Sequence, residues 1–255
     1  MNNMEMFSLK GRTALITGAS RGIGEAIAHL LAQQGAFCIL VSRKAQDLEV
    51  VENYIKSKGG EAVSIACNMG DIEQIKELMA HVEEKYGKLD ILINNAAANP
   101  YFGEMINAEE RAWDKTNDVN LKGPFFMIQY AAKLMKKNGG GSIVNVSSIN
   151  GVQPSLFQGI YSITKAGLIT MTRAYSRELA PHNIRVNALL PGLTDTKFAS
   201  AITKNEDIKN LILPQIPMGR IARPEEMAPA VLYLVSDAAS YTTGICLTCD
   251  GGMLS

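Results

Sequence analysis

Short apolar runs rich in β-branched residues alternate with longer, helix-like stretches along the chain. These runs predict seven strands, at Thr13–Thr17, Phe37–Val41, Ala62–Ala66, Leu89–Ile93, Ser142–Val146, Ile184–Ala188 and Gly244–Thr248. The stretches between them predict helices, among them Ile72–Tyr86, a long helix from about Trp113 past Leu134, and Tyr161–Leu179. Such alternation indicates an α/β fold: a doubly wound parallel sheet of about seven strands with helices on both faces.

The chain has 255 residues and contains no internal repeat or linker, so we expect a single domain over residues 1–255. Residues 193–219 are too long for an ordinary connection. This segment is either a substrate lid or a helical pair packed on the body, and its length alone does not decide between them.

A glycine-rich turn, Thr17–Gly24, lies directly between the first predicted strand and the first helix. Its three glycines let the backbone turn tightly and approach a pyrophosphate, which the helix N-terminus then binds. This placement indicates a Rossmann-like dinucleotide site. The candidate cofactor-binding residues in the turn are Gly18, Ser20, Arg21, Gly22, Ile23 and Gly24.

The end of the second strand favours NADP(H) over NAD(H). An NAD site usually carries an acidic residue about 20 positions beyond the glycines. Here Ser42 and Arg43 follow the strand, and no carboxylate appears before Asp47. A guanidinium attracts the 2′-phosphate that a carboxylate would repel, and Arg21 in the turn adds a second one. NAD(H) remains the alternative.

Tyr161 and Lys165 stand four positions apart at the start of a predicted helix and therefore share a face. An adjacent cation is expected to lower the pKa of the phenol toward the range useful for proton transfer. Ser148 follows the fifth strand, at the sheet edge where ligands bind in such folds. The three residues predict a site for proton exchange with a substrate oxygen.

These motifs, in this order, resemble the short-chain dehydrogenase/reductase family, in its compact single-domain form, nearly end to end. The residues that carry the resemblance are Thr17, Gly18, Gly22, Gly24, Asn94–Ala97, Asn120, Ser148, Tyr161, Lys165, Asn187, Pro191, Gly192, Thr196 and Asp250–Gly252. The chain departs from the family pattern at Asn68, where an aspartate is common, and at Ala97, where glycine is usual.

The resemblance implies a role for each catalytic residue. Tyr161 would exchange a proton with the substrate oxygen, Ser148 would hydrogen-bond that oxygen, and Lys165 would lower the phenol's pKa and hold the nicotinamide ribose. Asn120 would hold a water that relays protons to Lys165, and Asn94 would support the sheet end. Further cofactor contacts are expected from Asn68, Met69, Asn95, Ala96, Pro191, Gly192, Thr194 and Thr196.

Aromatic and amide side chains in the loops after the strands predict a pocket for a fairly apolar ketone or aldehyde. The candidate substrate contacts are Tyr101, Phe102, Gln153, Phe157 and Phe198. Within the family, the chain is most similar to NADP(H)-dependent carbonyl reductases. One alternative is a 3-oxoacyl-[acyl-carrier-protein] reductase, with Lys133, Lys136 and Lys137 docking an acidic carrier; another is a non-catalytic cofactor-binding protein.

The chain contains 25 basic and 25 acidic residues, so no net charge favours nucleic acid or an anionic membrane as a partner. Without a signal peptide or membrane span in the sequence, we expect a cytoplasmic protein. Cys246 and Cys249 lack partner ligands, so no metal site is expected. The family resemblance implies a homo-oligomer, commonly a tetramer.

Overall fold

The computed structural model describes residues 5–199 and 206–255. All seven strands form one parallel sheet in the order β3-β2-β1-β4-β5-β6-β7. They are β1 Thr13–Thr17, β2 Phe37–Ser42, β3 Glu61–Ala66, β4 Ile91–Asn94, β5 Gly141–Val146, β6 Ile184–Pro191 and β7 Cys246–Cys249. The strand order reverses between β1 and β4, which opens a crevice at their carboxyl ends. The predicted doubly wound fold is confirmed.

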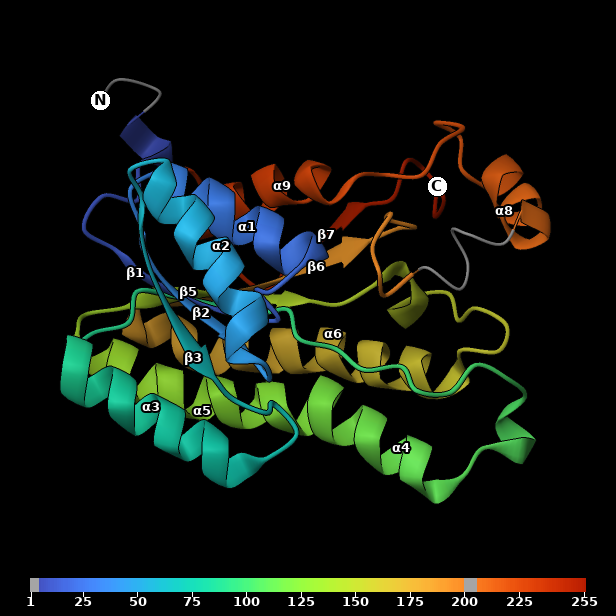
Figure 1. Ribbon diagram of the computed structural model, residues 1–255, viewed down its shortest axis with the longest axis horizontal. Helices are drawn as coiled ribbons and strands as arrows, with labels where there is room; N and C mark the ends of the chain where they lie inside the picture. Colours follow the sequence, from blue (N-terminus) through green and yellow to red (C-terminus); the bar gives the residue numbers. More distant parts are fainter. Residues whose placement is uncertain (1–4, 200–205) are drawn as a thin grey trace.

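Helices cover both faces of the sheet (Figure 1). One face carries α1 Gly22–Gln33, α2 Ala45–Ser57 and α9 Ala228–Val235. The other carries α3 Ile72–Tyr86, α4 Glu110–Asn117, α5 Gly123–Lys137 and α6 Gly159–Leu179, and α8 Glu206–Ile212 lies at one end. Short 3₁₀ turns lie at Glu5–Phe7, Met105–Asn107, Ile149–Gly151, Ala180–His182, Leu213–Gln215, Pro224–Glu226 and Asp237–Ala239.

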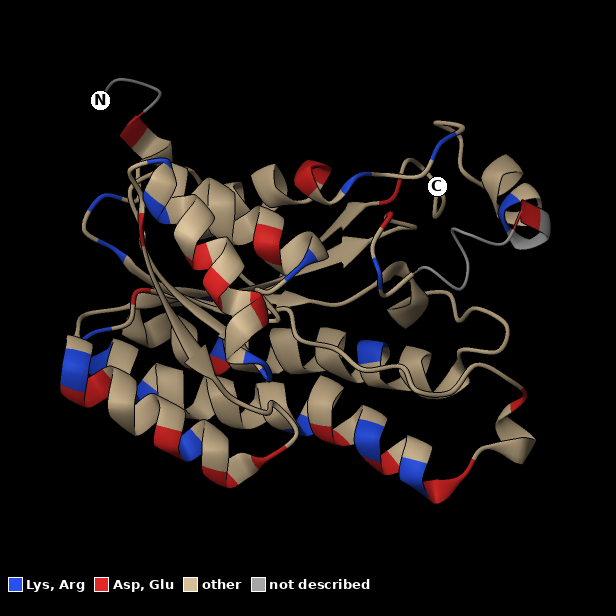
Figure 2. Cartoon of the chain, viewed as in Figure 1, with Lys and Arg blue, Asp and Glu red and all other residues tan. Residues whose placement is uncertain are grey.

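The strands contribute side chains to two separate apolar cores, one on each face of the sheet, because successive side chains point to opposite faces. In β1, Ala14 and Ile16 pack with α1 and α9, whereas Leu15 packs with α3 and α5. A strand buried on both faces needs apolar residues at every position, which explains its continuous apolar run. Charged residues of both signs are interspersed over the outer helices (Figure 2). Within the described residues, no helix is long and apolar enough to cross a membrane.

The structure differs from the predicted elements at two places that bear on the site. β6 runs to Pro191, three residues further than predicted. The loop after β6 therefore starts at the carboxyl edge of the sheet, on the side of the crevice. The single long helix predicted from Trp113 is interrupted by a π-helical turn at Asp118–Lys122, which separates α4 from α5. A π turn inserts an extra residue without changing the apolar spacing much, so periodicity does not show it.

Candidate active site

Polar side chains converge at the carboxyl ends of β4 and β5 and the first turns of α6. Ser148 comes two residues after the end of β5, and Tyr161 and Lys165 lie near the start of α6. Tyr161 is 8% exposed and Lys165 only 2%. The Lys165 Nζ lies 5.4 Å from the centre of the Tyr161 ring and donates to the Val146 carbonyl at 2.7 Å. The structure therefore brings the predicted trio together.

Burial, not the neighbouring cation, dominates the pKa of Tyr161. Desolvation raises the pKa of this phenol to about 12, although a hydrogen bond with Ser148 opposes the shift. The same burial lowers the pKa of Lys165 to about 7. The expected lowering of the Tyr161 pKa by Lys165 is therefore wrong for the protein by itself, because Lys165 loses much of its own charge. At neutral pH the Tyr161 phenol is therefore in its neutral form, the form from which a proton can be donated.

Asn120 lies in the π turn and joins two parts of the site. Its Oδ1 accepts from the Ala98 N–H at 2.7 Å, and its Nδ2 donates to the Ala98 carbonyl at 2.9 Å. The same Nδ2 donates to Thr164 Oγ1 at 3.2 Å, beside Lys165 on α6. Its side chain thus fixes the loop after β4 against α6.

A buried polar network anchors α6 to the sheet, and the sequence prediction missed it. Asn94 Nδ2 donates to Asn145 Oδ1 at 2.9 Å, and Asn145 Nδ2 donates to Thr172 Oγ1 at 2.9 Å. Ser147 Oγ donates to the Lys165 carbonyl at 2.8 Å. An asparagine in the middle of an apolar strand was the available signal, because such a group is buried only when it is hydrogen-bonded.

The glycine turn fits a pyrophosphate. Gly18 and Gly22 have φ values of +67° and +61°, a conformation that favours glycine. α1 starts at this turn with no side-chain cap, whereas Asp71 caps α3. The first N–H groups of α1 are therefore available for phosphate oxygens. A Cβ on Gly22 would come within 3.1 Å of Thr196, so the space around the turn is narrow.

Thr17 and Asn95 hold the shape of this turn. The Asn95 and Ala96 N–H groups donate to Thr17 Oγ1 at 2.9 and 3.0 Å. Asn95 Nδ2 donates to the carbonyls of Thr17 and Gly18 at 2.9 and 3.2 Å. The Asn95 amide nitrogen is thus already hydrogen-bonded to the turn. We therefore expect Asn95 to affect cofactor binding by holding the shape of the turn.

The remaining predicted cofactor residues lie around the same crevice. Ser20, Ile23 and Ser42 are half-buried, and the guanidinium-bearing Arg21 and Arg43 are exposed. After β3, Asn68 Oδ1 accepts from the Gly70 N–H at 3.2 Å, and Met69 is buried. After β6, Pro191 pairs with Cys249, and the Gly192 N–H donates to the Cys249 carbonyl at 2.9 Å. Thr194 forms a parallel bridge with Ala222.

The candidate substrate contacts divide into two groups. Phe198 packs on Tyr161, with 5.7 Å between the centres of the two rings. Phe102 and Phe157 form a second ring pair, at 5.8 Å. Tyr101 donates its hydroxyl to the Glu104 carbonyl at 2.7 Å, and Gln153 is exposed. Only Phe198 is in ring contact with Tyr161 within the described chain.

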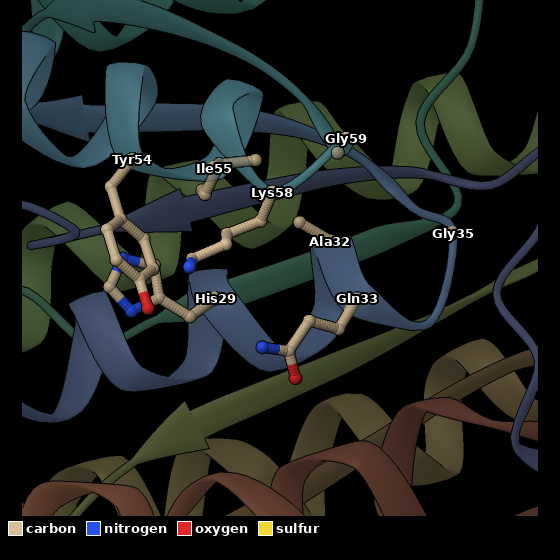
Figure 3. A pocket seen from close by; sticks show the side chains of 9 residues that line it. His29, Ala32, Gln33, Gly35, Tyr54, Ile55, Lys58 and Gly59 are labelled. Carbon is tan, nitrogen blue, oxygen red and sulfur yellow. The ribbon is translucent and has the colours of Figure 1, made fainter.

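A cavity of about 180 Å³ lies between the C-terminal parts of α1 and α2 (Figure 3). His29, Gln33, Tyr54 and Lys58 line it, together with backbone near Gly59. These residues precede β2 and β3, so the cavity lies at the amino ends of the strands, away from Tyr161. It contains none of the predicted site residues.

Cys246 and Cys249 are free thiols that belong to different apolar clusters, as expected for strand positions three apart. In residues 5–199 and 206–255, no group of three or more potential ligands could hold a metal ion. The fold and the site together define an oxidoreductase of the nicotinamide-dependent class: a dinucleotide crevice with a buried phenol, Tyr161, beside it.

Comparison with known proteins identifies the family. A family model described as Enoyl-(Acyl carrier protein) reductase matches residues 18–254. Dehydrogenase/reductase SDR family member 4 of Homo sapiens is 38% identical over 244 residues, covering 96% of this chain and 88% of that protein. The chain belongs to the short-chain dehydrogenase/reductase family, whose members bind a nicotinamide cofactor and act on small molecules.

Two further matches are of similar strength. The 3-oxoacyl-[acyl-carrier-protein] reductase FabG of Thermotoga maritima is 39% identical over 246 residues, covering 96% of this chain and 99% of that protein. A crystal structure from Beutenbergia cavernae with bound NADP has a TM-score of 0.94 and 33% identity, covering 97% of this chain and 98% of that one.

Proposed function

We propose that the protein is an NADP(H)-dependent oxidoreductase that interconverts a fairly apolar ketone or aldehyde and the corresponding alcohol. The observation that carries this proposal is the buried Tyr161–Lys165 pair beside Ser148, at the sheet edge that also holds the uncapped start of α1. The site thus offers a proton donor next to a dinucleotide crevice, which is what carbonyl reduction requires.

In this proposal the bound nicotinamide supplies the hydride chemistry, and the protein supplies position and protons. The neutral Tyr161 phenol donates its proton to the substrate oxygen, which Ser148 orients by a hydrogen bond. Lys165 holds the ribose and replenishes the phenol's proton. Asn120 keeps α6 and the loop after β4 in register. In the proposed mechanism it would also hold a water that relays protons to Lys165.

The preference for NADP(H) rests on Arg43, with Ser42 and Arg21 assisting. Both guanidinium groups are exposed at the edge of the crevice, where a 2′-phosphate would accept their hydrogen bonds. The related structure from Beutenbergia cavernae holds NADP at low occupancy. NAD(H) is the alternative, and Arg43→Asp should shift the ratio of kcat/KM values toward NADH by at least about tenfold, because a carboxylate repels the phosphate.

In this proposal the segment 193–219 is the substrate lid; its residues 200–205 lie outside the described part of the chain. Phe198 supports this role, because its ring already contacts the Tyr161 ring. We expect the protein to be cytoplasmic and a homo-oligomer, with a tetramer expected from its family. Size-exclusion chromatography with light scattering tests the oligomeric state directly.

The deciding experiment measures NADPH and NADH oxidation by purified protein over a panel of ketones, aldehydes and 3-oxoacyl esters. We expect NADPH-dependent reduction of apolar ketones or aldehydes. Calorimetry with each dinucleotide accompanies it, because failure to bind either one removes the proposal. Tight binding without turnover, or undiminished turnover in Tyr161→Phe, would instead favour the non-catalytic or a different catalytic interpretation.

A 3-oxoacyl reductase is the second candidate, favoured by the similarity to FabG of Thermotoga maritima. The sequence suggested that Lys133, Lys136 and Lys137 could dock an acidic carrier. The structure weakens this argument, because the three lysines lie where α5 leads into β5, at the sheet edge opposite Tyr161. Lys137 is also paired with Glu83 at 2.5 Å. Faster turnover of a carrier-bound 3-oxoacyl thioester than of any free ketone would establish this candidate.

A further inference from the structure

Large apolar side chains are exposed in all three loops that follow β4, β5 and β6. They are Phe102, Met105, Ile106, Val152, Leu156, Phe157 and Phe198. The carboxyl ends of parallel strands share one edge of the sheet, so the loops that carry these side chains lie on the same side as the start of α6, at the right of Figure 1. Exposed apolar side chains grouped around a polar site indicate a ligand surface.

Contacts join the loop after β4 to the segment that leads into α6. Asn99 Nδ2 donates to Gln158 Oε1 at 3.2 Å, and the Gly103 N–H donates to the Phe157 carbonyl at 3.0 Å. The Phe102 and Phe157 rings meet at 5.8 Å and 54°. Met105 occupies the space that a Cβ on Gly159 would need. We call residues 99–105 and 157–159 the loop clasp.

Phe157 has an unfavourable backbone within this clasp. Its φ is +63°, in the left-handed region where a Cβ crowds the following carbonyl. The other described non-glycine residue with positive φ is Asn183, a residue type that tolerates this conformation. A glycine at position 157 would relieve the crowding, yet a bulky phenylalanine stands there. Strain that surrounding contacts hold in place near an active site suggests that the side chain itself is needed.

The position of Phe157 connects the clasp to catalysis. Gln158, the next residue, is the N-cap of α6, and its carbonyl accepts from the Ser162 N–H at 2.9 Å. Tyr161 lies three residues after Gln158, in the first turn of this helix. Phe157 therefore directly precedes the helical turn that carries the proposed proton donor, and its ring is held against Phe102.

We propose that Phe157 is a specificity-determining residue, and that with Phe102 it selects flat, ring-bearing ketones over acyclic ones. The proposal rests on the proposed function. The two rings are 47% and 48% exposed, which leaves aromatic faces free for a ligand. A flat ring system stacks on such faces and has little conformational freedom to lose, whereas an alkyl chain stacks less and is ordered at greater entropic cost.

The test compares two ketones of equal carbon number, α-tetralone and 2-decanone, with the preferred dinucleotide. The wild-type protein is expected to favour α-tetralone in kcat/KM. In Phe157→Ala this preference falls about fivefold, because the lost aromatic contact acts mainly on the ring-bearing substrate. Phe102→Leu shifts the preference in the same direction. Tyr54→Ala is the matched control: this ring is 46% exposed, at the far edge of the sheet, and its loss leaves the preference unchanged.

Phe157→Gly separates the ring from the strain. It also removes the ring, so the substrate preference falls as in Phe157→Ala, but glycine adopts a positive φ freely. Its melting temperature is therefore expected to exceed that of Phe157→Ala by about 2 °C. A lower melting temperature for the glycine variant would overturn the strain argument.

The possible failures are distinguishable. Wild-type turnover that favours 2-decanone, an unchanged preference in both Phe157 variants, or an equal loss on both ketones would overturn the specificity proposal and leave the proposed function standing. If wild-type protein reduces no ketone or aldehyde with either dinucleotide, the proposed function falls, and this inference falls with it.

Discussion

The chain contains two Tyr-x-x-x-Lys pairs with almost the same local geometry and opposite surroundings. Tyr161 and Lys165 lie 5.4 Å apart, measured from Nζ to ring centre, and Tyr54 and Lys58 lie 5.5 Å apart. The first pair is buried at the carboxyl edge of the sheet; the second is exposed at the amino edge, with Tyr54 46% accessible. Figure 3 shows Lys58 reaching toward the Tyr54 ring.

The difference shows that spacing on a helix brings the two groups together but does not make a site. Burial shifts the pKa of Tyr161 upward to about 12 and that of Lys165 downward to about 7. Ser148, the glycine turn and the loops after β4 and β5 lie at the sheet edge of the Tyr161–Lys165 pair, not at that of the Tyr54–Lys58 pair. His29 is instead the aromatic neighbour of Tyr54, with 4.5 Å between the ring centres.

The largest expected effect comes from removing each phenol hydroxyl in turn. Tyr161→Phe should lower kcat/KM for carbonyl reduction by about 10²–10⁴-fold, because general acid catalysis is lost. Tyr54→Phe should change it less than about twofold. Steady-state kinetics measures kcat/KM for both variants, and calorimetry shows whether each variant still binds the dinucleotide. If kcat/KM fell by a comparable factor in both variants, the conclusion that only the buried Tyr–Lys pair takes part in the reaction would be wrong.

The lysines should differ in how stability depends on pH. Between pH 7 and 9 the unfolded chain keeps the Lys165 proton while the folded protein has largely released it, since the folded pKa is about 7 against an ordinary 10.5. The wild-type protein therefore gains about 2 kcal/mol of unfolding free energy over that window from this group. The raised pKa of Tyr161 acts in the opposite direction, but only above pH 10.

Lys165→Met should lack this gain, and Lys58→Met, which alters an exposed side chain, should keep the wild-type profile. Urea unfolding at pH 7 and pH 9 measures the difference for all three proteins. A Lys165→Met profile parallel to that of the wild type would show that the buried ammonium is not desolvated as the structure indicates.

The smallest expected effects come from the aromatic neighbours. Phe198→Ala removes the ring that packs on Tyr161 and should lower kcat/KM about two- to tenfold, the range of one aromatic contact. His29→Leu removes the ring beside Tyr54 and should leave activity unchanged.

His29→Leu should also change stability by less than about 1 kcal/mol. The buried His29 Nε2 finds no hydrogen-bond partner within the described part of the chain, so little is lost with it. Thermal unfolding and kinetics on the two variants provide the measurement. An activity loss in His29→Leu as large as that in Phe198→Ala would mean that the two regions are coupled.

Most elements of the fold were predictable because local patterns specify them. The apolar runs located all seven strands to within three residues, and the position of Gly18–Gly24 between β1 and α1 located the phosphate turn. The π turn around Asn120 was not predictable, since one inserted residue barely alters the apolar period. The Asn94–Asn145–Thr172 hydrogen-bond network was not predictable either, because its partners lie on three different elements that meet only after folding.

The sequence by itself determined the parallel sheet, the glycine turn and the four-residue spacing of Tyr161 and Lys165, since all three depend on residues close together in the chain. Only the tertiary structure decided which of two similar Tyr–Lys pairs is buried, in which direction its pKa values shift, and that Phe157 takes a left-handed backbone against Phe102. Burial and desolvation depend on elements distant in sequence, and no local pattern contains them.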